Sequence, residues 1–224
     1  MCDKLKQIRS LPLFEGVTED QLVAIEKVSQ CRHLKNNEIL FNENDPVQSI
    51  YVVIYGSFKI LKQSEQDNQV IFNFLGRNEV LGSSVARLPM PRYTVSAVAN
   101  EESCILKLSL PNFTLHFLKN PILETRVHAQ ISERFVEFQE DRCLSNSLVS
   151  QKLAHFLLRT LDRQHESCRQ QILIPLTRID IAKRIGSKTE TIVRKLSQWT
   201  KNGWLKTHSK HIEILNREAL EKVK

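Results

Sequence analysis

A segment near the C-terminus constrains the fold of this chain more tightly than any other part. It holds two short apolar-periodic runs, each opened by a hydroxyl residue with an acidic residue three positions later: Thr177 with Asp180, and Ser187 with Glu190. This spacing is the capping box that starts a helix. Gly186 lies between the runs and can take the left-handed conformation that a tight turn requires. The pattern therefore predicts a helix-turn-helix.

The residues around this motif complete a small domain. A shared core is expected from Ile181, Ile185, Ile192 and Leu196. Ala182 is small enough for the two helices to cross closely, and Asn202-Gly203 should end the second helix. Residues 204–208 and 211–215 then predict a hairpin wing around Ser209-Lys210.

The distribution of charge points to a polyanion as the partner of this domain. From residue 150 onward the chain has 16 Lys plus Arg against 7 Asp plus Glu, whereas residues 1–149 have 16 against 18. The excess of basic residues that gives the chain its net charge of +7 thus lies entirely in the last third. Such asymmetry favours a nucleic-acid-binding C-terminal module.

The N-terminal half has a different periodicity. Residues 18–28 predict a helix with Thr18 as its N-cap, because Leu22, Ile25 and Val28 share one face. Short apolar strands follow at residues 38–41, 49–55, 57–62, 70–75, 93–98 and 104–108. Many short strands at regular spacing predict an antiparallel barrel or sandwich.

A long helical period then begins at Asn120-Pro121. Its apolar residues Val127, Ile131, Phe135 and Phe138 are spaced four, four and three apart and form one stripe. The stripe could pack on the β domain alone, but we favour a dimer seam. A second helix is expected over residues 149–163.

These patterns predict an α+β chain with three parts. An N-terminal antiparallel β domain should span residues 1–119. A long dimerisation helix should span residues 120–147. A winged helix-turn-helix that binds DNA should span residues 148–224.

The sequence resembles the CRP/FNR family, a group of bacterial regulators named for the cyclic-AMP receptor protein and the fumarate–nitrate regulator. The resemblance covers nearly the whole chain and is strongest over residues 176–194, while residues 120–123 and 50–56 are similar too. The resemblance implies that residues 1–119 form a jelly-roll-like β-roll sensor of the cyclic-nucleotide-binding type, followed by a dimerisation helix and a winged helix.

The resemblance also implies roles for individual residues. Glu190 and Arg194 would contact bases, and Thr189 would occupy a position used to vary specificity. Arginine can pair with the guanine edge, and glutamate can accept from the cytosine amino group. The alternative is that Glu190 and Arg194 form an ordinary i,i+4 pair on a solvated helix. The residues expected to contact phosphate are Arg178, Lys188, Lys195, His208 and Lys210.

The sensor half departs from the family members that bind cyclic AMP. The residues assigned to the effector pocket are Ser83, Ser84, Arg92, Tyr93 and Phe138. Arg92 could pair with a phosphate. Ser83 replaces the glutamate that holds the ribose hydroxyl, Tyr93 replaces a small hydroxyl residue, and Phe138 aligns with a threonine that meets the adenine. Cyclic AMP is therefore not expected to be a tight ligand, and the identity of an effector stays open.

Cofactors receive little support from the sequence. Cys2 stands alone before Cys31, without the cysteine cluster of iron–sulfur members, so no iron–sulfur cluster is expected. We predict no metal site, because no ligand spacing for one is present.

The resulting hypothesis is a homodimeric transcription regulator with double-stranded DNA, RNA polymerase and possible small-molecule effectors as partners. We expect a cytoplasmic protein, not an enzyme, with no membrane contact, since no apolar run approaches about 20 residues and no catalytic motif is evident. The alternative is a cyclic-nucleotide-binding signalling module whose winged helix contacts a protein.

Overall fold

The computed structural model describes residues 4–63, 69–163, 171–172, 174–208 and 210–223. Cys2 and Ser209 lie outside the described residues. The chain divides into two compact units, which are formed by the described parts of residues 1–62 with 73–136 and of residues 63–72 with 137–224. The division falls inside the long helix that the sequence analysis treats as a separate segment.

The first unit begins with helices that cover the β-roll core. They are α1 (Lys4–Arg9), the short 3-10 helix η1 (Pro12–Phe14) and α2 (Glu19–Val28). Thr18 is the N-cap of α2, and its backbone N–H donates to Oε1 of Gln21. Leu22 and Ile25 are buried, as the apolar spacing predicts.

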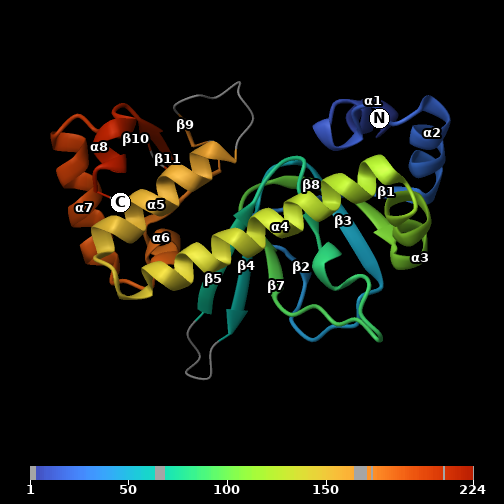
Figure 1. The fold of residues 1–224 in the computed structure, drawn as a ribbon, viewed down its shortest axis with the longest axis horizontal. Helices are drawn as coiled ribbons and strands as arrows, with labels where there is room; N and C mark the ends of the chain where they lie inside the picture. The colour runs from blue at the N-terminus through green and yellow to red at the C-terminus, as the bar shows by residue number, and fades with distance from the viewer. Residues whose placement is uncertain (1–3, 64–68, 164–170, 173, 209, 224) are drawn as a thin grey trace. The chain divides into compact units, whose positions relative to one another are not determined.

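Two four-stranded antiparallel sheets follow (Figure 1). One has the order β1-β8-β3-β6 and the other the order β2-β7-β4-β5. The strands are β1 (Ser29–Leu34), β2 (Ile39–Phe41), β3 (Ser49–Tyr55), β4 (Phe58–Gln63), β5 (Gln69–Leu75), β6 (Val80–Leu81), β7 (Ser96–Ala99) and β8 (Ser103–Ser109). The predicted antiparallel roll is confirmed, although β1 and β6 were not predicted.

The core of the roll lies between the inner faces of the sheets. Strand β3 is buried on both faces except at its last residue, and Phe58 at the start of β4 is fully buried. Gly56 joins β3 to β4 with φ +81°, and a Cβ there would lie 2.7 Å from the backbone oxygen of Glu102. Only glycine fits this turn without displacing the neighbouring chain.

After the roll come α3 (Leu110–Phe113), the π-helix η3 (Thr114–Leu118) and α4 (Pro121–Cys143). Figure 1 shows the first part of α4 lying against the roll. Val127 is 2% exposed and packs into the roll core, so its assignment to a dimer seam was wrong. Ile131 is partly buried against the same core. Phe135 and Phe138 are 59% and 55% exposed and remain available to a partner.

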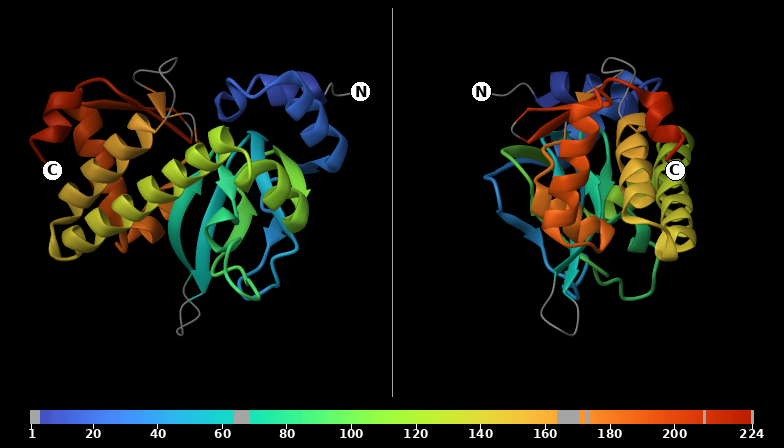
Figure 2. Two further views of the ribbon diagram at one scale, coloured as in Figure 1. Left: turned by 45° about the vertical axis from the view of Figure 1, so that its right-hand side comes forward. Right: turned by 90° about the vertical axis from the view of Figure 1, so that its left-hand side faces the viewer.

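Apart from the described parts of residues 63–72 in β4 and β5, the second unit is a winged helix preceded by the end of α4. It contains the 3-10 helix η4 (Leu144–Asn146), α5 (Val149–Asp162), β9 (Gln171–Ile172), α6 (Arg178–Ile185), α7 (Thr189–Lys201), β10 (Leu205–His208), β11 (His211–Ile214) and α8 (Arg217–Glu221). Its antiparallel sheet has the order β10-β11-β9. Figure 2 shows α5 turning back beside the end of α4. The helix α8 is held to α5 by the guanidinium of Arg217, which bonds the carboxylate of Asp162.

Candidate nucleic-acid interface

The start of α6 is fixed by the first predicted cap. The hydroxyl oxygen of Thr177 accepts a hydrogen bond from the backbone N–H of Asp180 at 3.0 Å, and the same hydroxyl donates to the Asp180 carboxylate at 2.6 Å. Asp180 is buried in this arrangement and lies in the first turn, where the helix dipole favours a negative charge. The cap therefore sets where α6 begins.

The turn between α6 and α7 depends on glycine, as predicted. Gly186 has φ +70°, and the backbone N–H of Ser187 returns to the carbonyl of Ala182 at 3.0 Å. The second predicted cap was wrong by one residue. The N-cap of α7 is Lys188, without a side-chain hydrogen bond, so Ser187 and Glu190 do not form a capping box. Glu190 is consequently not engaged in capping.

Helix α7 has two clearly different faces. Ile192, Leu196 and Trp199 are buried against the rest of the winged helix, and Ile181 and Ile185 of α6 are buried as well. The opposite face exposes Glu190 and Arg194 near the start of the helix, while Thr189 is half-buried. A helix that is packed on one face and polar on the other can place its first turns in the major groove of DNA.

The ion pair expected from the i,i+4 alternative is not formed. Among the residues that the structure describes, no hydrogen bond or ion pair joins Glu190 to Arg194. Both groups therefore remain free to meet donors and acceptors outside the protein. Helix α7 also exposes Val193 on this face, at a position between them that the sequence analysis missed. A residue three after Glu190 must share its face, so helical spacing alone could have found it.

The wing is anchored to the start of the helix-turn-helix. The backbone N–H of Leu176 donates to the carbonyl of Lys210 at 2.7 Å, which places Lys210 beside the segment that leads into Arg178. His208 lies at the end of β10 and is exposed, with Nε2 4.0 Å from the carboxylate of Glu213. The side chains of Lys188 and Lys210 are exposed, and those of Arg178 and Lys195 are partly exposed. These predicted phosphate ligands thus reach solvent.

The interior of the β-roll, where the effector pocket was predicted, is occupied by aromatic side chains. The ring of Phe41 stacks on that of Tyr93 at 3.9 Å between centroids and on that of Tyr51 at 5.8 Å. The hydroxyl of Tyr93 donates to the backbone oxygen of Ser49. Burial raises the pKa of the Tyr93 phenol, so the group stays neutral at physiological pH.

The five residues assigned to the effector pocket differ in their burial and in the unit to which they belong. Ser83 is buried and its hydroxyl donates to the carbonyl of Val80 at 3.4 Å. Ser84 and Arg92 are exposed, and the Arg92 guanidinium donates to the backbone oxygen of Asn44 at 2.7 Å. Phe138 is exposed and belongs to the second unit. Ser83 and Tyr93 are thus buried in the roll, and the grouping of the five residues as one effector pocket stays a prediction.

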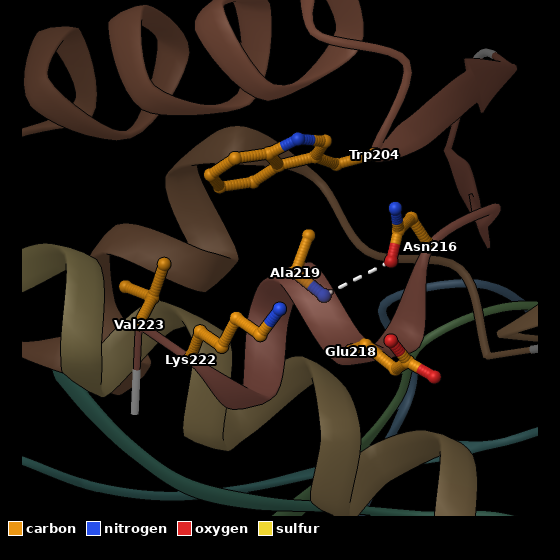
Figure 3. Close-up of a pocket in the computed structure, with 6 residues that line it drawn as sticks. All are labelled: Trp204, Asn216, Glu218, Ala219, Lys222 and Val223. Atoms are coloured by element: carbon orange, nitrogen blue, oxygen red, sulfur yellow. Dashed lines mark hydrogen bonds between the residues drawn. The ribbon is translucent and has the colours of Figure 1, made fainter.

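A pocket of about 460 Å³ lies elsewhere, between Trp204 and α8 (Figure 3). Its lining residues are Trp204, Asn216, Glu218, Ala219, Lys222 and Val223. The Asn216 side chain accepts from the backbone N–H of Ala219 at 2.9 Å and is thereby used to cap α8. The pocket is lined by none of the predicted DNA-contacting residues.

Within the described residues, no group of three or more His, Cys, Asp or Glu is placed to hold a metal ion. The same part of the chain has no helix that is both long enough and apolar enough to cross a membrane.

Comparison with known proteins agrees with both halves of the fold. Residues 31–118 match the model of the cyclic nucleotide-binding domain, and residues 151–223 match that of the Crp-like helix-turn-helix domain. The chain is 26% identical to the transcriptional activator protein Anr of Pseudomonas aeruginosa, over 92% of this chain and 84% of that protein. It is 22% identical to a CRP-like cAMP-activated global transcriptional regulator of Mycobacterium tuberculosis, over 93% of this chain and 94% of that protein.

Solved structures show the same architecture. FixK2 from Bradyrhizobium japonicum superposes with a TM-score of 0.76 at 20% identity, over 88% of this chain and 98% of that one. The two domain models match successive parts of the chain, and the relatives span nearly all of it. The chain belongs to the CRP/FNR family and is a DNA-binding transcription regulator.

Proposed function

We propose that the protein binds a two-fold DNA site as a homodimer and reads it with the exposed face of α7. Glu190 and Arg194 contact bases, and Thr189 adjusts the preference. The phosphate contacts come from Arg178, Lys188, Lys195, His208 and Lys210. Val193 joins the reading face, where its methyl groups suit the methyl of a thymine.

One observation carries this proposal. Glu190 and Arg194 point away from the buried face of α7 and do not pair with each other, although their spacing allows it. On a solvated helix such a pair is worth about 0.2–0.5 kcal/mol. Because Glu190 and Arg194 do not pair with each other, both charged groups are available to contact the edges of base pairs.

The homodimer is supported by the apolar side chains that α4 leaves exposed. Phe135 and Phe138 lie three positions apart and face solvent in the subunit. Covering a phenylalanine in this way contributes about 1.5–3 kcal/mol for each side chain. The two-fold symmetry of such a seam would match a palindromic DNA site.

Regulation by cyclic AMP has less support. Tyr93 is stacked on Phe41, and the exposed guanidinium of Arg92 bonds the backbone oxygen of Asn44, so we infer that neither side chain is placed to hold a cyclic nucleotide. These residues do not fit a cyclic nucleotide. We infer that cyclic AMP is not the effector. We also infer that the protein acts in the cytoplasm, has DNA and RNA polymerase as partners, and is not an enzyme.

A gel shift at physiological salt, with duplexes selected from a randomised pool, tests the proposal. The expected result is enrichment of an inverted repeat that binds two subunits. The alternative, a signalling module whose winged helix contacts a protein, predicts no enriched motif and no shift beyond that of random duplex.

A further inference from the structure

Glu137 is an unusual residue for the outer part of a long polar helix, because it is only 6% exposed. Its carboxylate is held by two arginines from two different helices. Oε2 accepts from Nη1 of Arg163 in the segment that ends α5, at 3.0 Å, and Oε1 accepts from Nη2 of Arg184 in α6, at 3.2 Å. A buried carboxylate is costly unless it is paired and hydrogen-bonded in this way.

Arg184 completes the connection from the side of the helix-turn-helix. Its side chain is nearly as buried as that of Glu137, and Nη2 also bonds Oδ2 of Asp141 one turn further along α4. The guanidinium lies 5.6 Å from the ring centroid of Phe156 on α5. Arg184 therefore belongs to the interior, although in the sequence it counts among the basic residues of the DNA-binding segment.

We propose that Glu137 and Arg184 are positioning residues for DNA recognition. They fix α6 on the end of α4, and α7 follows because the two helices share the core residues Ile181, Ile185 and Ile192. In a dimer joined along α4, this contact sets the separation and the rotation of the two recognition helices. The inference rests on the proposed homodimer and its two-fold site.

The chemistry of the contact makes the geometry specific. A planar guanidinium held between two carboxylates and over a ring has one favourable orientation, whereas a lysine ammonium is a point charge that cannot reproduce it. Arg184→Lys keeps the charge and loses the fixed direction. Glu137→Gln keeps the size and loses the charge. Neither change touches a residue proposed to contact DNA.

If Glu137 and Arg184 position the recognition helices, they determine which separation between the DNA half-sites the dimer prefers. Adding one base pair between half-sites moves them apart by about 3.4 Å, and it rotates them by roughly 34–36°. A rigidly placed pair of recognition helices tolerates neither change. A loosely placed pair tolerates both at some loss of affinity for the best site.

The test compares the full-length protein with Glu137→Gln and Arg184→Lys on duplexes whose half-site separation varies by one and two base pairs, and on an isolated half-site. Glu133→Gln is the matched control, because Glu133 is an exposed residue on the same helix. Circular dichroism and thermal melting establish that each variant is folded, and either folded variant alone suffices for the comparison.

We expect the parent protein and Glu133→Gln to prefer one separation sharply. In Glu137→Gln and in Arg184→Lys, the ratio of the affinity for the best separation to that for a shifted separation should fall by about tenfold. This is the lower end of what the loss of one charge-assisted hydrogen bond permits. Affinity for the isolated half-site and its sequence preference stay unchanged. Folded variants that keep the parent's preference for one separation overturn the positioning role and leave the proposed function intact. A parent protein without any preferred separation overturns both.

Discussion

The winged helix and the interior of the β-roll use their polar side chains in opposite ways. On α7, Glu190 and Arg194 face solvent without bonding to each other. In the roll, Tyr93 is stacked on Phe41 and its hydroxyl is bonded to Ser49. One region keeps its polar groups available to a partner, and the other satisfies them within the fold. Recognition of DNA by this chain is therefore expected at its C-terminal surface.

The largest expected effect concerns the electrostatic part of this contrast. Between Thr177 and Lys210 there are nine Lys plus Arg against Asp180 and Glu190. Arg184 is buried and is not expected to contact DNA, but the other Lys and Arg residues of this segment can neutralise phosphates. With about 6–10 phosphates neutralised per dimer, affinity for duplex DNA should fall by roughly 10³–10⁵ between 50 and 200 mM salt. Fluorescence anisotropy measures this slope, and an affinity independent of salt would remove the electrostatic argument.

The second prediction tests whether the roll interior is a packed core. Tyr93→Ala should lower the free energy of unfolding by about 3–5 kcal/mol, because it leaves a cavity beside Phe41. The neighbouring change Arg92→Ala removes one exposed hydrogen bond and should cost about 0.5–1.5 kcal/mol.

Urea denaturation of the two variants gives both values. Calorimetry with cyclic AMP completes the test, and the parent protein should show no submicromolar binding. Equal losses of stability in the two variants, or tight binding of cyclic AMP, would contradict a self-filled interior.

The third prediction addresses the exposed end of the apolar stripe. Phe138→Glu should weaken dimerisation, since it removes about 1.5–3 kcal/mol of apolar burial from each subunit and places like charges across the two-fold axis. Gln139→Glu, which adds the same charge at the adjacent exposed position, should leave the dimer unchanged. Analytical ultracentrifugation distinguishes the two outcomes. A Phe138→Glu protein that sediments like the parent would place the seam elsewhere on α4.

Local periodicity was sufficient to predict the two helices of the helix-turn-helix and the hairpin wing. Both helices, the glycine turn at Gly186 and the wing are where the spacing of apolar and capping residues puts them. The second cap moved to Lys188 because the chain leaving Gly186 stays extended one residue longer than the Ser187 pattern suggests. Such shifts are common at helix ends, where several hydroxyl and acidic residues compete for the same role.

Other features had no local signal. Strands β6 and β9 have two residues each, and β1, with the sequence SQCRHL, lacks the alternation of a typical strand. Sheet pairing with distant strands holds them in place. Glu137 is similar: within α4 it looks solvated, and its partners Arg163 and Arg184 are distant in the sequence. Val127 was assigned to the dimer seam for a related reason, because the apolar spacing of a helix does not reveal which part of the protein packs against it.

The most direct test of the central claim is a selection from randomised duplexes with the parent protein, Arg194→Ala and Glu190→Ala. Each base contact should discriminate by about 1–3 kcal/mol at one base pair. Arg194→Ala should lose the preference for a guanine in both half-sites, and Glu190→Ala that for a neighbouring cytosine. Lys210→Ala is the control, because a phosphate contact weakens all sequences about equally. If the Arg194 and Glu190 variants enrich the same motif as the parent protein, α7 does not read bases through these residues.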